Sequence, residues 1–154
     1  MWLSLWVALG VSGCAHQVAF QDAHYEIGGT RHPDRVLVVI DHATLSSKTV
    51  INSGMAGVAN DWEVQPGQML KQVADIEFPQ MFSSYQCQTV YPDKAPEVQV
   101  AIVELSVVKY DFSDFHATIS IRAVVSRMSG GKQVLLNQTY HGTGPSQGGK
   151  MFWG

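Results

Sequence analysis

Apolar positions along the chain follow two different periods, which divide it into predicted elements. Residues 35–41 form a nearly continuous aliphatic and β-branched run, which is typical of a buried strand. Residues 66–85 instead carry apolar side chains three and four positions apart, which predicts an amphipathic helix. Pro66 and Gly67 open this helix, and Pro79 is expected to kink or restart it. The positions near one face are Leu70, Val73, Ala74, Glu77 and Met81.

The second half of the chain has the period of two that β-strands require. A short strand is expected over residues 87–91, and three longer strands follow it. Both faces are apolar over residues 98–107, so we expect this strand to be central in a sheet. Residues 115–125 alternate, which indicates one buried and one wetter face. Ser129-Gly130-Gly131-Lys132 has the composition of a hairpin turn, and leads to a third strand at residues 134–140.

The polar segment at residues 42–66 is the least predictable part of the chain, with short edge strands expected at residues 49–51 and 62–64. The resulting order is strand, irregular segment, helix and then three or four antiparallel strands. We therefore predict an α+β domain in which an antiparallel sheet of four to six strands packs against one helix.

An uncharged apolar stretch occupies residues 2–11, and it is too short to span a membrane as a helix. It is followed by Val11-Ser12-Gly13-Cys14, which resembles the lipobox of bacterial lipoproteins. The resemblance implies a signal peptide over residues 1–13, cleavage between Gly13 and Cys14, and lipid attached to Cys14. No Lys or Arg precedes the stretch, so either the natural start lies upstream or export uses an uncharged variant.

The residues after Cys14 bear on where such a lipoprotein resides. Ala15 stands where an Asp retains lipoproteins in the inner membrane, so the resemblance implies the periplasmic face of the outer membrane. Residues 14–34 are polar and weakly periodic, and we expect them to form the lipidated cysteine and a tether. Residues 35–154 then form one periplasmic domain, expected to lack a further C-terminal helix of the natural chain.

This layout resembles small envelope lipoproteins of Gram-negative bacteria, including YajG-like lipoproteins and auxiliary lipoproteins of transport and assembly systems. The features that carry the resemblance are the strand at residues 36–40, the helix start at Pro66-Gly67 with Leu70, and the hairpin at residues 101–125. The resemblance implies a role in the cell envelope and carries over no catalytic or binding residue.

Composition and motifs argue against several functions for the folded part of the chain. The formal charge of −3, with no cluster of Lys or Arg, argues against nucleic-acid binding through phosphates. Cys14 and Cys87 lack the spacing of zinc ligands, and the motifs of common hydrolases and nucleotide-binding enzymes are missing from the sequence, so we expect no metal, no cofactor and no catalytic residue. Asp111, Asp114 and His116 resemble an acid/base set, but turn chemistry accounts for the two Asp residues.

Aromatic side chains are the candidate interaction residues, because aromatic anchors dominate interface energies. They flank the turn before the strand at residues 115–125 and also stand near the end of the sequence: Tyr110, Phe112, Phe115, Phe152 and Trp153. They either belong to the core or form a docking patch.

The hypothesis is a lipid-anchored, non-enzymatic accessory protein that binds an envelope protein. The first alternative is a carrier that holds lipid or another small apolar ligand between helix and sheet. The second is a periplasmic hydrolase around His116 and Asp114.

Overall fold

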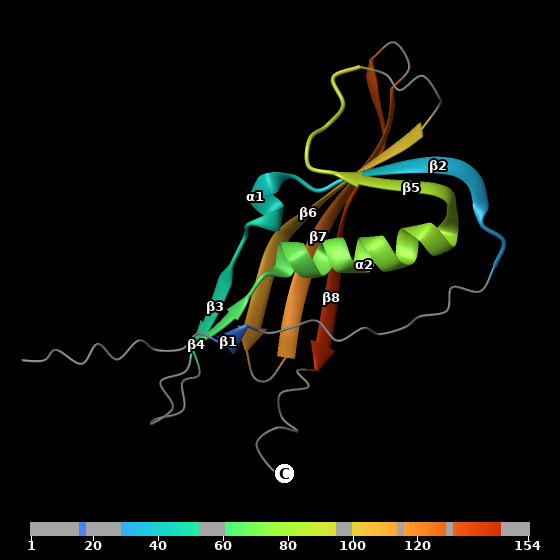
Figure 1. Cartoon of the computed structure of the whole chain (residues 1–154). Helices are drawn as coiled ribbons and strands as arrows, with labels where there is room; N and C mark the ends of the chain where they lie inside the picture. The colour runs from blue at the N-terminus through green and yellow to red at the C-terminus, as the bar shows by residue number, and fades with distance from the viewer. Residues whose placement is uncertain are drawn as a thin grey trace, which may run out of the picture.

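Two sheets and two helices make up the part of the chain that the computed structural model describes, residues 16–17, 29–52, 61–94, 100–113, 116–128 and 131–145 (Figure 1). The strands are β1 (His16–Gln17), β2 (His32–Val39), β3 (Thr49–Asn52), β4 (Asp61–Val64), β5 (Phe82–Gln88), β6 (Val100–Ser113), β7 (His116–Met128) and β8 (Lys132–Pro145). The helices are α1 (His42–Leu45) and α2 (Pro66–Met81). This confirms the α+β class.

The larger sheet has five strands in the order β5-β2-β6-β7-β8, and a small sheet has the order β1-β4-β3. The prediction of an antiparallel sheet is correct only for β6, β7 and β8, because β2 lies parallel to both β5 and β6. The chain leaves β2, passes through α2 and returns to β5 beside it, so a helical crossover links two parallel neighbours. The nearly continuous aliphatic run of β2 is typical of a strand in a parallel sheet, and the antiparallel prediction did not take this into account, so this part of the prediction was wrong.

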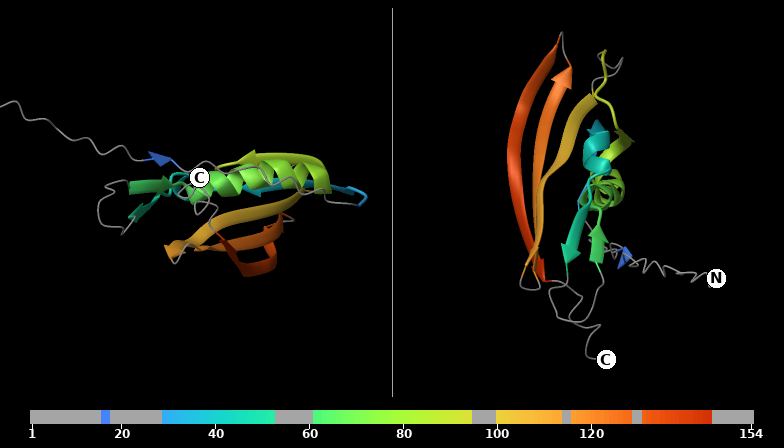
Figure 2. Two further views of the ribbon diagram at one scale, coloured as in Figure 1. Left: turned by 90° about the horizontal axis from the view of Figure 1, so that it is seen from below. Right: turned by 90° about the vertical axis from the view of Figure 1, so that its left-hand side faces the viewer.

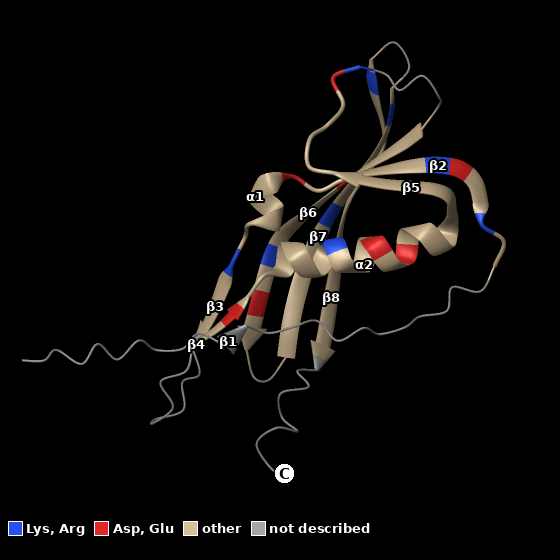
Figure 3. Ribbon diagram, in the orientation of Figure 1, with Lys and Arg blue, Asp and Glu red and all other residues tan. Residues whose placement is uncertain are grey.

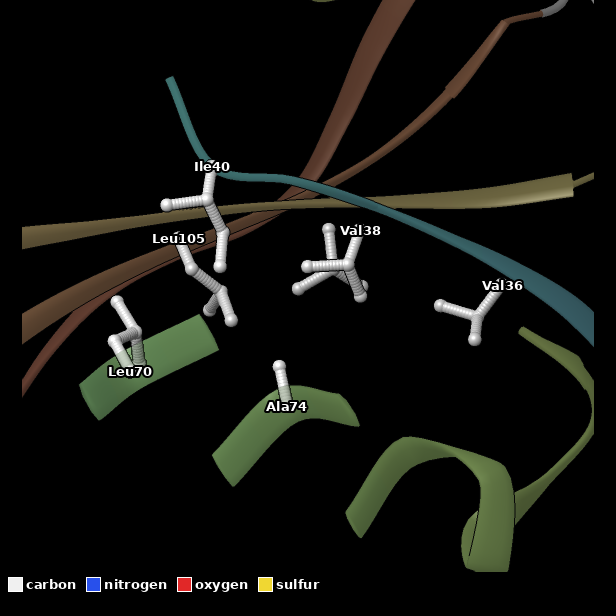
Figure 4. Close-up of a cluster of buried hydrophobic side chains, with 7 residues drawn as sticks. Val36, Val38, Ile40, Leu70, Ala74 and Leu105 are labelled. Carbon is white, nitrogen blue, oxygen red and sulfur yellow. The ribbon is translucent and has the colours of Figure 1, made fainter. Parts of the chain in front are cut away.

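The main core lies between α2 and one face of the larger sheet (Figure 4). Val36 and Val38 come from β2, and Ile40 directly follows it. Each of the three is 2% exposed or less. Leu70 and Ala74 of α2 meet them from the helix side. Val103 and Leu105 of β6 complete the buried cluster. The predicted inner face of the helix is confirmed at Leu70 and Ala74, whereas Val73 is exposed.

A second buried cluster occupies the opposite face of the same strands. Leu37 and Val39 of β2 and Ile102 of β6 are buried there, with Tyr91 packed against them. Tyr91 belongs to the segment after β5, so this segment covers the face that α2 does not reach. Because β2 is thus buried on both faces and paired on both edges, it is the most enclosed strand of the sheet.

Three boundaries differ from their predicted positions. β2 begins at His32, inside the predicted tether, and β1 within the same tether pairs with β4. The chain changes from helix to strand at Phe82, so the helix is shorter than predicted and β5 begins earlier. α2 continues through Pro79 to Met81 as one helix. Local patterns fix the type of an element better than its ends, which depend on pairing partners.

The short helix α1 was not predicted. Its N-cap is Asp41, whose Oδ1 accepts a hydrogen bond from the backbone N–H of Thr44 at 2.6 Å, as helix caps do. α1 packs against the start of α2, where Gly67 lies under the carbonyl of Thr44. A Cβ on Gly67 would lie 1.8 Å from that carbonyl oxygen, so only glycine fits there.

We therefore predict that Gly67→Ala lowers the free energy of unfolding by at least about 2 kcal/mol, because α1 and α2 must separate to admit the methyl group. Urea denaturation measures this change. Gly142→Ala is the matched control, since its Cβ would meet only Ile119 Cγ2 at an ordinary 3.6 Å. Equal stability of the Gly67→Ala variant and the unsubstituted protein would contradict the close contact of the two helices.

Candidate functional site

The helices lie on one side of the larger sheet and leave part of that side uncovered. In the right-hand view of Figure 2, the long strands β6, β7 and β8 form a curved layer with α1 and α2 on one side. α2 packs against β5, β6 and β2. β7 supplies only partly buried side chains to the main core, and β8 supplies none among the residues described. β3 of the small sheet also contacts β6, and the part of this face that neither α2 nor β3 covers is the first candidate site.

Strand register places two of the predicted aromatic residues on this face. Tyr110 pairs with Ile119, and Phe112 pairs with Ala117. Ile119 shares a face with Ile121, which packs against the main core, because side chains two positions apart in a strand point the same way. Tyr110 and Phe112 therefore point to the helix side, where both are half-buried. Burial raises the pKa of the Tyr110 hydroxyl.

Tyr140 of β8 extends this apolar surface to the edge of the sheet. It pairs with Ile121, so it lies on the same face, and it is 49% exposed. We call this surface the open patch, and it consists of Tyr110, Phe112, Ile119, Ile121 and Tyr140. The open patch joins aromatic and β-branched side chains from three neighbouring strands, as docking surfaces for proteins do.

The other predicted site residues fall outside the described residues: Gly13, Cys14, Phe115, Phe152 and Trp153. Asp114 lies outside them as well. Asp111 lies within β6 opposite Thr118, and its Oδ1 accepts a hydrogen bond from the backbone N–H of Phe112 at 2.9 Å. An Asp in a turn bonds to the backbone two residues on, so this contact does not confirm the turn chemistry expected for Asp111. Sequence reasoning missed Tyr140, because the exposed position of its strand depends on the sheet order.

The edge strand β8 carries exposed apolar side chains on both faces. Val134, Leu135 and Leu136 are 51%, 50% and 39% exposed. Leu136 pairs with Val125 and Val134 pairs with Ser126, so Leu135 is an extra residue in a bulge. Between residues 133 and 145 this strand has no Asp, Glu, Lys or Arg (Figure 3). Such an edge offers both backbone hydrogen bonds and apolar contacts to another strand.

An open groove of about 380 Å³ lies on the face of the sheet opposite α2. Its charged groups are held by neighbours within the groove. Lys132 Nζ lies 2.5 Å from Glu104 Oε1 and 4.3 Å from the centre of the Tyr91 ring, and Arg122 donates to Asn137 at 2.9 Å. These groups hold β8 against β6 and β7. In the described ranges, no group of three or more His, Cys, Asp or Glu side chains is placed to bind a metal ion.

A polar cluster fastens β5 to the outer side of α2. Asp75 accepts hydrogen bonds from Tyr85 at 2.6 Å and from Lys71 at 2.5 Å. Burial, followed by the hydrogen bond to Asp75, raises the pKa of Tyr85 well above its usual range. Burial pushes the pKa of Asp75 up, but the hydrogen bonds from Lys71 and Tyr85 outweigh it and leave that pKa below its usual value. Cys87 follows on the same strand and packs against the main core.

No protein-family model, curated protein or solved structure matches this chain. Within the described residues, neither helix is long and apolar enough to cross a membrane.

The lowered pKa of Asp75 predicts a pH-dependent contribution to stability. A carboxylate whose pKa is lower in the folded protein stabilises it above the ordinary pKa near 3.8, and this contribution disappears as the pH falls through the lowered value. Asp75→Asn should therefore destabilise the protein at neutral pH but not in strong acid. The difference should be no more than about 1 kcal/mol, because the Lys71 and Asp75 side chains are 39% and 40% exposed and solvent screens the pair.

Urea unfolding at neutral pH and at successively lower pH measures this effect. The exposed Asp93, substituted by Asn, controls for the change in net charge. A difference between Asp75→Asn and the unsubstituted protein that persists unchanged into strong acid would contradict the assignment.

Proposed function

We propose that this chain is a lipid-anchored accessory protein of the bacterial cell envelope that binds a protein partner of an assembly or transport system. Residues 1–13 act as the signal peptide, cleavage falls between Gly13 and Cys14, and lipid on Cys14 holds the domain at the periplasmic face of the outer membrane. The domain acts by binding, without a catalytic step or a cofactor. The lipobox-like run that ends at Cys14 supports the anchor.

The open patch is the observation that carries the binding role. It joins Tyr110, Ile119 and Tyr140 on a face that α2 leaves partly uncovered, and Tyr140 is half-exposed at its margin. Burying an exposed aromatic side chain releases water from a large apolar area, and such residues anchor protein interfaces. A folded partner that covers this face removes more apolar surface from water than a small ligand does.

The packing between α2 and the sheet favours protein binding over the carrier role. Buried side chains from both layers fill that space, including Ile40 from the end of β2, Leu70 from α2 and Leu105 from β6 (Figure 4). An apolar ligand held there would have to displace them, and a close-packed core resists such displacement. The open patch, in contrast, is available without rearrangement of the core.

The anchor is tested by expressing the full precursor in a Gram-negative host with a labelled fatty acid, beside a Cys14→Ala variant. We expect label on the unsubstituted chain and none on Cys14→Ala, because only the Cys14 thiol accepts the lipid. Equal labelling of the two, or no labelling of either, would contradict the anchor.

The docking surface is tested in the same host with a photoreactive phenylalanine at position 140 and, as control, at position 90. Val90 is 68% exposed and precedes Tyr91 in the segment that covers the opposite face of the sheet. We expect the probe at position 140 to capture one envelope protein from the membrane fraction, and the probe at position 90 to capture it at least about tenfold less, a difference of about 1.4 kcal/mol in contact preference. Equal capture at both positions removes the open patch as the docking surface while leaving the anchor intact.

A further inference from the structure

The outer edge of β8 is the largest unpaired edge in the described sheets. β8 has fourteen residues and stands last in the strand order, with β7 as its neighbour on one side. In an antiparallel strand, every second residue directs its N–H and C=O away from the existing neighbour. These groups on the outer edge of β8 can therefore pair with one more strand.

The edge of β8 has little of the protection that sheet edges usually have. Proteins block edges with charged side chains, proline, bulges or short strands. In β8 the features that protect an edge lie only near its two ends. Lys132 and the bulge at Leu135 lie near the start of the strand, and Pro145 is its last residue. From Leu136 to Gly144 the strand pairs with β7 in unbroken register and has no Asp, Glu, Lys or Arg. This uninterrupted section fits an incoming strand.

We propose that β8 pairs antiparallel with β8 of a second copy of this chain, which joins the two five-stranded sheets about a two-fold axis. Like charges that face each other across two strands are destabilising. The uninterrupted section has no Asp, Glu, Lys or Arg, so two copies of it can pair without this repulsion. The Lys132 side chains lie at opposite ends of the joined strands, about 40 Å apart at 3.3 Å per residue.

The geometry of the ladder restricts the register of this pairing. Residues that face each other across an antiparallel pair must both direct their backbone groups toward the partner strand, or both away from it. When the two strands are identical, this condition requires the two-fold axis to pass beside one residue, which then faces its own copy. The axis cannot pass midway between two residues.

Gln138 is the residue that gives the most favourable register. With the axis at Gln138, Leu136 faces Tyr140 of the second copy, and Tyr140 faces Leu136 of the second copy. Leu136 is 39% exposed and Tyr140 is 49% exposed in the single chain, and aromatic and aliphatic side chains opposite each other stabilise a sheet. Both lie on the face of the open patch, since they pair with Val125 and Ile121 of β7. The dimer therefore joins the open patches of two copies into one surface.

The pairing should be weak and should depend on concentration. With the axis at Gln138, only residues 136–140 lie in the uninterrupted section on both strands, and they span about 17 Å, so the shared edge is small beside a standard specific interface. The inference goes beyond the proposed function, because it concerns pairing between copies and needs neither the lipid anchor nor the envelope partner.

Disulfide crosslinking in membranes from cells that make the full chain tests this pairing. Cys87→Ser serves as the parent, so that the thiol of Cys87 is removed. Gln138→Cys in this parent places two thiols opposite each other across the axis, within reach of a disulfide. Gln133→Cys is the matched control, because it is an exposed glutamine of the same strand. Its two copies would lie about 33 Å apart in the dimer.

After mild oxidation we expect the Gln138→Cys chain to form a species of twice the mass at least about tenfold more than Gln133→Cys, with the parent as the baseline that includes any thiol left on Cys14. Unchanged urea midpoints show that both variants fold. Equal crosslinking at the two positions, crosslinking of position 138 only to another protein, or none above the parent would overturn the proposal. A parent that itself crosslinks indicates unlipidated Cys14 and so counts against the anchor alone.

Discussion

The enclosure of β2 is the constraint on which the rest of the structure depends. Val36, Val38 and Ile40 point to α2, while Leu37 and Val39 point to the opposite face, and all five are almost completely buried. The backbone of the strand pairs with β5 on one edge and β6 on the other. A strand buried on both faces must have both edges paired as well, because unpaired buried N–H and C=O groups are costly. Burial of both faces also needs a cover on each side, and α2 covers one face of β2 while the segment around Tyr91 covers the other.

This requirement determines which part of the sheet remains open. α2 has sixteen residues and packs where β5, β2 and β6 lie, so β7 and β8 extend beyond its cover. The helix side of β7 is consequently only half-buried, and β8 is exposed from Lys132 to Thr143. The open patch and the unpaired edge of β8 thus have one origin, since a single helix cannot cover a five-stranded sheet. The binding roles proposed for them use surface that the core leaves uncovered.

Much of the fold follows from local pattern, because burial imposes a period on each element. The aliphatic run of β2, the helical spacing of Leu70 and Ala74, and the two apolar faces of β6 each predict their element. The parallel direction of β5 was not predictable in this way, since it depends on the crossover through α2. Of the open patch, the sequence indicated Tyr110 and Phe112 through their place beside a turn. Tyr140 was missed, because its exposure depends on the position of β8 at the edge of the sheet.

Native-state hydrogen exchange of the β2 amides tests the central role of this strand most directly. If the enclosure of β2 holds the fold together, the amides of residues 36–40 exchange only when the whole protein unfolds, with an opening free energy equal to that of global unfolding. The account is contradicted if these amides exchange through a smaller opening while the amides of β6 and β7 stay protected. In that case the antiparallel pair of β6 and β7, and not β2, holds the fold together.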